Sequence, residues 1–218
     1  MYRFFFKSFF DIAFALMALP FLLIILLIVS PIVVFEDKGP VFYNSMRLGK
    51  NGKLFKLFKI RSMKMNSPDI RIIDGSTFNS EDDPRLTKIG KFLRKTSIDE
   101  TPQIINIIKG EMSFIGPRPD LPEALLVYSN KQKNKLDVKP GITGYSQAFY
   151  RNSICSKEKF TNDIYYVNHI SLKLDISILF NTLKNVIFQK SVFLRNDDLL
   201  DMGGNHDKGR KNPVDSFK

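Results

Sequence analysis

The sequence predicts an α+β fold, in which a small, mostly helical domain with a short β-hairpin follows a long apolar helix at the N-terminus. Three observations lead to this prediction. Residues 12–35 contain no charged side chain, an Asn-Gly pair at positions 51–52 separates two runs of strand-forming residues, and later segments repeat apolar residues at helical spacing. We divide the chain into an anchoring segment over residues 1–37, a domain over residues 38–190 and a C-terminal extension over residues 191–218, whose polar end we expect to be disordered.

The apolar run is long enough to reach across a bilayer. As a helix it would be roughly 36 Å long, and a hydrocarbon core is about 30 Å thick. A cleaved signal peptide fits poorly, because its apolar region is usually about 7 to 15 residues and ends at a small-residue cleavage site. We therefore expect this run to anchor the chain in a membrane.

Basic residues flank the run on both sides, with Arg3 and Lys7 before it and a basic stretch from Lys38 after it. The positive-inside tendency places both ends on the cytoplasmic face. A re-entrant helix that is broken within the membrane satisfies both ends, and Pro20 and the Ser30-Pro31 pair are the available breakers. The alternative is a spanning helix with a tolerated proline kink, which would place the N-terminus outside.

The basic stretch over residues 38–64 contains no acidic residue. Its cations are Lys38, Arg47, Lys50, Lys53, Lys56, Lys59, Arg61 and Lys64. Most of them suit docking on anionic lipid headgroups, at about 1 kcal/mol per residue near the surface, and Arg61 is a candidate phosphate contact. Within the stretch, the Asn-Gly pair lies between residues 41–43 and residues 54–60 and predicts a short antiparallel hairpin.

Polar and amphipathic segments follow the hairpin. Residues 66–84 are rich in Ser, Asn, Pro and Gly and predict a loop that can move over a site. The next segment predicts a helix with an apolar stripe at Leu86, Ile89, Phe92 and Leu93. A later amphipathic pattern favours a helix that faces the core over one that lies at a membrane interface. Its residues are Leu172, Ile176, Leu179, Leu183 and Ile187.

The composition limits which kinds of partner and catalytic site the protein can have. The formal net charge of +11 indicates an anionic partner, and charge alone does not choose among nucleic acid, a phosphorylated substrate and lipid headgroups. The single cysteine, Cys155, excludes an internal disulfide and indicates a reducing, cytoplasmic compartment. His169 and His206 are far apart and offer no pattern for a zinc site or a histidine-activated nucleophile. Carboxylates therefore have to carry any acid-base chemistry.

Two adjacent carboxylates, Asp99 and Glu100, open a predicted helix that ends at Gly110. A purely structural interpretation is a helix cap, because Ser97 and Glu100 have capping-box spacing and acids are favoured there by the helix dipole. The neighbourhood favours a site instead, because the chain is rich in cations and Arg118 follows in a turn flanked by prolines. A guanidinium in such a rigid turn is well suited to hold a phosphate bidentately.

Several ordered motifs resemble the bacterial sugar transferases called small monotopic polyprenyl-phosphate phosphoglycosyl transferases, from about Lys7 to Lys190. The resemblance rests on residues 94–103, Asn106, residues 109–113 and 116–119, and further on residues 39–42, 59–63 and 139–144, Arg151-Asn152, Lys159-Phe160, Asp163, Tyr165 and Tyr166. Departures from the family pattern are Ile24 where a proline is frequent, Ser45, Ile60, Thr101, and Phe149-Tyr150 before Arg151.

The resemblance implies an enzyme on the cytoplasmic face of the bacterial inner membrane that transfers a sugar 1-phosphate from a UDP-sugar to undecaprenyl phosphate and releases UMP. The phosphosugar is implied to be attached in between to the aspartate that matches Asp99. Glu100 would assist as a base or in placing Mg²⁺, so both carboxylates are candidate Mg²⁺ ligands. The candidate residues for binding substrate phosphate or nucleotide are Arg118, Arg151, Arg61, Arg94 and Gln147.

Further expectations follow from the same resemblance. The partners are the membrane with its anionic lipids and downstream glycosyltransferases that extend the product into a surface polysaccharide or glycoconjugate, and nucleic acid is not expected. Asp163 is interpreted either as a surface acid or as a metal or substrate contact. Two rival hypotheses remain: a membrane-tethered basic module that binds an anionic polymer, and a scaffold that has kept the fold and lost turnover.

Overall fold

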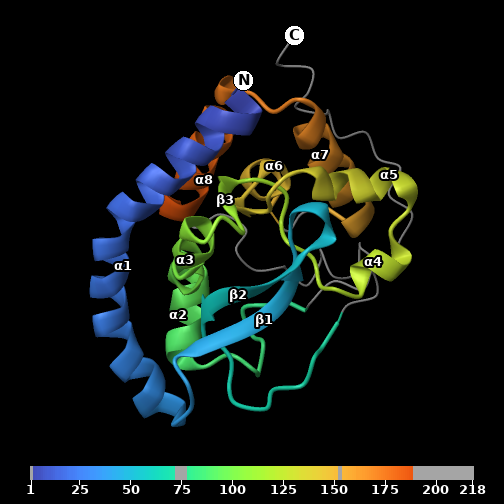
Figure 1. Cartoon of the computed structure of the whole chain (residues 1–218). Helices are drawn as coiled ribbons and strands as arrows, with labels where there is room; N and C mark the ends of the chain where they lie inside the picture. Colours follow the sequence, from blue (N-terminus) through green and yellow to red (C-terminus); the bar gives the residue numbers. More distant parts are fainter. Residues whose placement is uncertain (1, 72–77, 152–153, 189–218) are drawn as a thin grey trace.

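The computed structural model of the protein describes residues 2–71, 78–151 and 154–188. A domain of short helices and two small sheets lies against one long helix (Figure 1), which agrees with the predicted α+β fold. In chain order the elements are η1 (Tyr2–Phe6), α1 (Lys7–Asp37), β1 (Phe42–Leu48), η2 (Lys50–Gly52), β2 (Leu54–Ile60), α2 (Lys88–Thr96), η3 (Ile98–Glu100), α3 (Gln103–Ile108), β3 (Ser113–Ile115), α4 (Ala124–Val127), α5 (Asn130–Lys133), η4 (Asn134–Asp137), β4 (Gly141–Thr143), α6 (Tyr145–Phe149), α7 (Ser156–Asn168) and α8 (Leu172–Ile187). The extension over residues 191–218 lies outside the described residues.

The predicted hairpin is confirmed, with β1 and β2 paired antiparallel along their whole lengths. In the connecting turn, Asn51 and Gly52 adopt left-handed backbone conformations with φ of 57° and 73°, which explains why this pair suits the turn. Alternate side chains of β2, Phe55 and Leu57, point into a core that also contains Ala15 of α1. The second sheet joins β3 and β4 in parallel.

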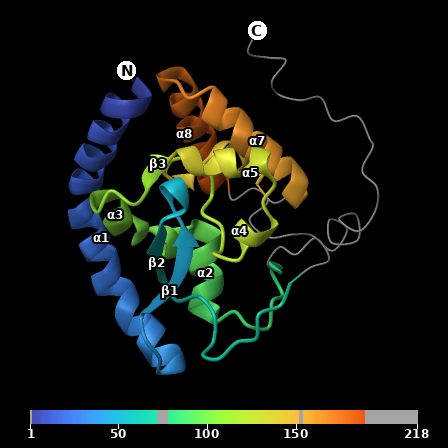
Figure 2. The same ribbon diagram turned by 45° about the vertical axis from the view of Figure 1, so that its right-hand side comes forward.

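α1 lies along one side of the domain and curves around it in both views (Figures 1 and 2). It is one helix of 31 residues that continues through Pro20 and Pro31, so the break predicted at these prolines is absent. The helix curves along its length around the domain (Figure 1), as long helices that wrap around a core do. Its buried side faces the domain through Leu22, Val29 and Val33.

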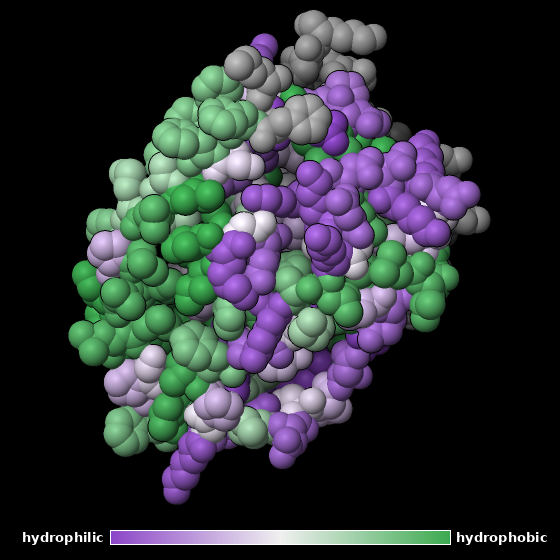
Figure 3. All heavy atoms as spheres, viewed as in Figure 1, coloured by the Kyte–Doolittle hydropathy of each residue, from purple (hydrophilic) through white to green (hydrophobic). Residues whose placement is uncertain are grey.

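The opposite side of α1 is apolar and exposed. The most apolar 18-residue segment of α1 has a mean hydropathy of 3.1, and only 17% of this segment is buried inside the protein. Large side chains such as Phe14, Phe21, Leu27 and Phe35 project away from the domain, and Figure 3 shows apolar side chains gathered along this side of the molecule. A surface of this length and composition is typical of membrane contact.

Both ends of α1 are bound to the domain. At the N-terminal end, Lys7 Nζ lies 2.7 Å from the Asp175 carboxylate of α8. At the C-terminal end, the Glu36 carboxylate accepts hydrogen bonds from the first amides of α2, at 2.6 Å from Lys88 N and 3.0 Å from Ile89 N, and Asp37 pairs with Arg61. The anchor and the domain therefore form one body.

α8 differs from its prediction. The apolar stripe predicted to face the core is exposed, with Ile176 58%, Leu183 53% and Ile187 73% accessible, whereas Asp175 and Ile178 on the other side are buried. The prediction was wrong because amphipathicity shows that a helix has an apolar face but does not show which face meets the core. The apolar face of α8 points away from the domain, and its position at a membrane interface stays a prediction.

Candidate active site

Asp99 and Glu100 lie on the short 3₁₀ turn η3 between α2 and α3. Ser97 ends α2 in a left-handed conformation, with φ of 59°, and its side chain caps nothing. The capping-box interpretation is therefore wrong, because a left-handed residue reverses the chain and leaves both carboxylates to point elsewhere. The Asp99 side chain is almost fully buried and that of Glu100 is 18% exposed.

Lys59 of β2 approaches both carboxylates. Its Nζ lies 2.9 Å from Oδ2 of Asp99 and 3.3 Å from Oε1 of Glu100. The sequence interpretation missed this residue, because it grouped Lys59 with the lysines expected to meet lipid headgroups. The available signal was its place in the matched segment over residues 59–63.

The two carboxyl groups have opposite pKa shifts. Burial raises the pKa of Asp99, and the neighbouring Glu100 carboxylate raises it further against the pull of Lys59. Burial also raises the pKa of Glu100, but Lys59 and Arg118 outweigh it and hold that pKa at about 2. Paired groups whose pKa values are pushed apart are typical of acid-base and nucleophilic sites.

Arg118 projects toward the pair from a rigid turn. Pro117 and Pro119 are buried while Arg118 is exposed, and its Nη2 donates to Oε1 of Glu100 at 3.3 Å. The side chain is 57% exposed, so the rest of its guanidinium remains open to an anionic ligand. The turn lies against the start of α6, where a Cβ on Gly144 would meet the carbonyl oxygen of Gly116 at 2.2 Å.

Three further predicted residues differ in their surroundings. Arg94 donates to Ser62 at 3.0 Å, and burial lowers its pKa although the charges of Asp99 and Glu100 oppose this shift. The Arg151 guanidinium has no hydrogen bond or ion pair among the described residues, and burial lowers its pKa although the Glu100 charge opposes this shift. The Gln147 amide is buried with no hydrogen-bond partner on either polar atom.

Arg61 and Arg47 both differ from the sequence predictions: Arg61 is occupied by protein partners, and Arg47 lies near the candidate site. Arg61 is buried and donates to Asp37, to the carbonyl oxygen of Pro40 at 2.7 Å and to that of Val33 at 3.3 Å. Its phosphate-contact prediction finds no support in this arrangement, because these partners occupy the guanidinium. Arg47 was not singled out, yet it is near the site: burial lowers its pKa, and the charge of Arg118 lowers it further.

A family model described as bacterial sugar transferase matches residues 2–189. The chain belongs to this family. It is 40% identical over 189 residues to "Galactosyl transferase CpsE" of Streptococcus agalactiae, covering 83% of this chain and 42% of that protein. It is 39% identical over 186 residues to "Uncharacterized sugar transferase EpsL" of Bacillus subtilis, covering 85% and 89%. It is 38% identical over 200 residues to "Undecaprenyl-phosphate galactose phosphotransferase" of Salmonella typhimurium, covering 84% and 40%. This bacterial sugar transferase thus spans under half the length of the first and third relatives.

The carboxylates of this bacterial sugar transferase fit a magnesium ion together with a substrate. In the part of the chain that the structure describes, no group of three or more His, Cys, Asp or Glu side chains forms a complete protein site. Mg²⁺ commonly binds through one or two carboxylates plus substrate phosphates. Asp99 and Glu100 supply such a pair of adjacent carboxylates, and Lys59 is the cation that contacts both of them.

Asp163 is neither a surface acid nor a member of the carboxylate pair. It is 4% exposed and lies in α7. Its Oδ2 lies 2.9 Å from Nζ of the buried Lys135. The surface-acid interpretation is therefore wrong, and the metal or substrate contact stays a prediction for a residue that forms a buried ion pair.

Proposed function

We propose that this bacterial sugar transferase moves a sugar 1-phosphate from a UDP-sugar to undecaprenyl phosphate and releases UMP. The observation that carries the proposal is the buried Asp99 beside Glu100, with Lys59 and Arg118 in contact with the pair. A carboxylate attacks a diphosphate only where cations offset the repulsion between the two anions. The name of the Salmonella relative, which combines undecaprenyl phosphate with a sugar phosphotransferase, supports the acceptor and the group transferred.

Asp99 is the proposed nucleophile. A carboxylate oxygen attacks the phosphorus that carries the sugar, the bond from that phosphorus to the bridging oxygen breaks, and its electron pair leaves with UMP. This step leaves the sugar 1-phosphate on Asp99 as an acyl phosphate. A phosphate oxygen of undecaprenyl phosphate then attacks the same phosphorus, which forms undecaprenyl-diphosphate-sugar and returns the Asp99 carboxylate.

The surrounding side chains stabilise charge during both steps. Lys59 holds Asp99 in place and offsets its charge, and Arg118 and Arg151 contact the oxygens of the diphosphate. Glu100 orients Lys59 and Arg118 through its ion pairs with both. Asp99 and Glu100 would hold Mg²⁺, which when bound supplies neutralisation of charge at the transferred phosphoryl group.

The two exposed apolar surfaces support attachment to one face of a membrane. Both ends of α1 contact the domain, and a spanning orientation would move one end about 30 Å away and break the contacts of Lys7 or Glu36. We infer that both ends of α1 lie on the same face of the membrane, the cytoplasmic face of the bacterial inner membrane. The apolar stripe of α8 then lies at the interface, beside anionic lipids. The lipid product would pass to glycosyltransferases that build a surface polysaccharide or glycoconjugate.

Release of UMP tests the proposed reaction. Purified protein is incubated with undecaprenyl phosphate, Mg²⁺ and a panel of UDP-sugars, with Asp99→Asn beside the wild type. We expect UMP with at least one donor and a loss of at least about 1000-fold in the variant. A wild type without turnover on any donor would favour the scaffold or polymer-binding rival, and equal release by Asp99→Asn would remove Asp99 as the nucleophile.

Thiol labelling of the N-terminus tests the topology. A single cysteine is placed before Arg3 in a Cys155→Ser background, and intact cells are treated with a reagent that does not cross membranes. We expect labelling only after the cells are opened. Labelling of intact cells would contradict a cytoplasmic N-terminus.

A further inference from the structure

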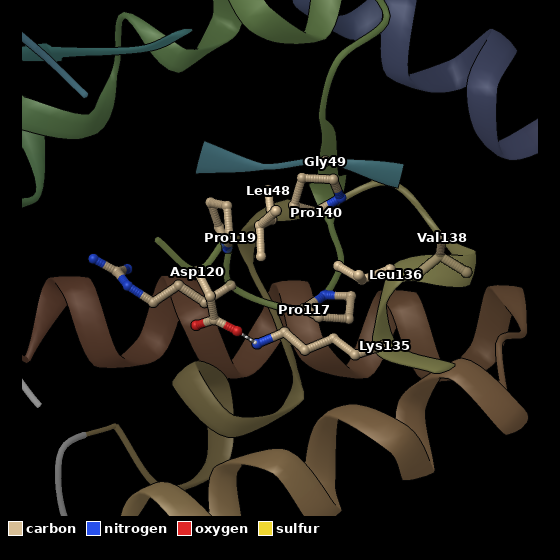
Figure 4. A pocket seen from close by; sticks show the side chains of 10 residues that line it. Leu48, Gly49, Pro117, Pro119, Asp120, Lys135, Leu136, Val138 and Pro140 are labelled. Carbon is tan, nitrogen blue, oxygen red and sulfur yellow. Dashed lines mark hydrogen bonds and ion pairs between the residues drawn. The ribbon is translucent and has the colours of Figure 1, made fainter. Parts of the chain in front are cut away.

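A buried ammonium group lies between two carboxylates beneath the Arg118 turn. Nζ of Lys135 is 2.6 Å from Oδ2 of Asp120 and 2.9 Å from Oδ2 of Asp163. Lys135 is 6% exposed, and its ammonium also lies 5.1 Å from the centre of the Phe160 ring. Figure 4 shows Lys135 and Asp120 pointing toward one another below Pro117 and Pro119.

Each partner of Lys135 belongs to a different part of the candidate site. Asp120 follows the Arg118-Pro119 pair, and its carbonyl oxygen accepts a hydrogen bond of 2.9 Å from Leu48 N, next to Arg47 at the end of β1. Its carboxylate also accepts a hydrogen bond from Tyr128. Asp163 lies in α7 and accepts a hydrogen bond of 3.4 Å from Ser146 of α6. One ammonium therefore joins the Arg118 turn to β1, α6 and α7.

The space around this cluster is too small for a ligand. The cavity lined by Leu48, Pro117, Lys135 and Pro140 has a volume of about 10 Å³, which is barely the room that one water molecule needs. Protein side chains therefore hold the Lys135 ammonium, and the Asp120 side chain is 29% exposed at the edge of the cluster. Burying an ion pair seldom adds stability compared with apolar side chains of the same size, whereas it fixes the position of the groups that it joins.

We propose that Lys135 is a positioning residue for the phosphate-binding arginines, because it holds Asp120 and Asp163 together and so fixes the Arg118 turn against β1, α6 and α7. This inference rests on the proposed function, in which Arg118 contacts the diphosphate. The Leu48–Asp120 hydrogen bond extends the same constraint to Arg47. Without the ammonium, the buried Asp163 carboxylate and the partly exposed Asp120 carboxylate would repel one another and displace the turn that carries Arg118.

A double-mutant cycle between Lys135 and Arg118 tests the inference. Lys135→Met, Arg118→Ala and the double variant are compared for donor KM in UMP release and for UMP binding by calorimetry, which needs no turnover. We expect Lys135→Met to raise the donor KM at least 10-fold in wild type and less than 3-fold in Arg118→Ala, since residues that act through one another are not additive. Lys133→Met, an exposed lysine two residues away, serves as the matched control and should keep wild-type values.

Two further variants separate positioning from folding. Lys135→Arg keeps the charge and should recover most of the donor affinity. Asp163→Asn removes one ion pair of Lys135, and Asp120 still offsets the charge of the ammonium. This variant should raise the donor KM at least 3-fold, and it keeps the test available if Lys135→Met does not fold. Equal effects of Lys135→Met in both backgrounds, or an unchanged donor KM in Asp163→Asn, would overturn the inference. A wild type that binds UMP without turning over would instead contradict the proposed function.

Discussion

The ammonium of Lys59 and the buried carboxylate of Asp99 form an ion pair of 2.9 Å that joins β2 to the turn η3. The two side chains come from segments that are distant in the sequence, and their contact puts a cation next to the proposed nucleophile. Lys59 stabilises the ionised form of Asp99, which burial disfavours. The reactivity of the proposed nucleophile, Asp99, thus depends on a residue of the hairpin.

Replacing Lys59 by methionine should lower kcat for UMP release by about 100-fold or more, because a preorganised charge beside the reacting group is lost. Lys59→Arg should recover part of the activity. Lys56→Met changes an exposed lysine on the same strand and should leave kcat unchanged. A Lys59→Met enzyme with normal turnover would exclude a role for this ion pair in the reaction.

The pH dependence of kcat/KM should identify Asp99 rather than Glu100 as the group that must be ionised. The pKa of Asp99 is raised, so activity should fall on the acid side above the ordinary aspartate range, whereas Glu100, with its pKa at about 2, stays ionised there. Glu100→Gln removes a negative charge next to Asp99, which lowers the Asp99 pKa and moves the acid limb to lower pH. Glu123→Gln, on an exposed glutamate, should not move the limb. A shift to higher pH in Glu100→Gln would contradict this assignment.

Arg61→Met should affect stability and not donor binding. The variant removes the Arg61 donor from Asp37, which keeps only the amide of Met65, and from two carbonyl oxygens. This loss costs about 2 to 3 kcal/mol for a partly buried pair and lowers the melting temperature by about 5 to 10 °C. Donor KM should stay within twofold of wild type, whereas Arg118→Met should raise it with little change in melting temperature. A raised KM with normal stability in Arg61→Met would restore Arg61 as a phosphate contact.

Tryptophan fluorescence can locate α8 relative to the bilayer, because the sequence contains no tryptophan. Leu183→Trp and Ile176→Trp place a probe on the exposed apolar stripe. In vesicles with brominated acyl chains we expect a blue-shifted emission that is quenched, as for an aromatic ring at the lipid interface. Lys131→Trp, on an exposed polar position of α5, should not be quenched. Equal emission from all three probes would place α8 outside the membrane.

Local features of the fold could be predicted from the sequence, and contacts between distant segments could not. Asn51 and Gly52 carry the turn preference in their own backbones, so the hairpin follows directly from them. The orientation of α8 depends on which parts of the protein pack against each of its faces. The spacing of its apolar residues does not show this. The continuity of α1 through Pro20 and Pro31 depends in the same way on the domain against which the helix packs.

The candidate site also combines features that local sequence predicts with contacts between distant segments that it does not predict. Local spacing suggested that Ser97 and Glu100 form a cap, but the left-handed conformation of Ser97 is set by the packing of η3 and is not visible in the spacing. Arg118 was predicted because its prolines define the turn by themselves. Lys59, Arg47 and Lys135 were missed as site residues because their partners lie elsewhere in the chain.

The burial of α1 side chains in the core of the domain has a consequence for how the protein can be handled. Ala15 packs with Phe55 and Leu57, and Val29 and Val33 pack with Ile60 and Leu93. Removing the helix would expose a large part of that core to water, so a shortened chain without α1 should aggregate when it is produced. α1 is part of the folded domain, and a more soluble version has to be obtained by changing the outward-facing residues of α1 while its inward-facing residues are kept.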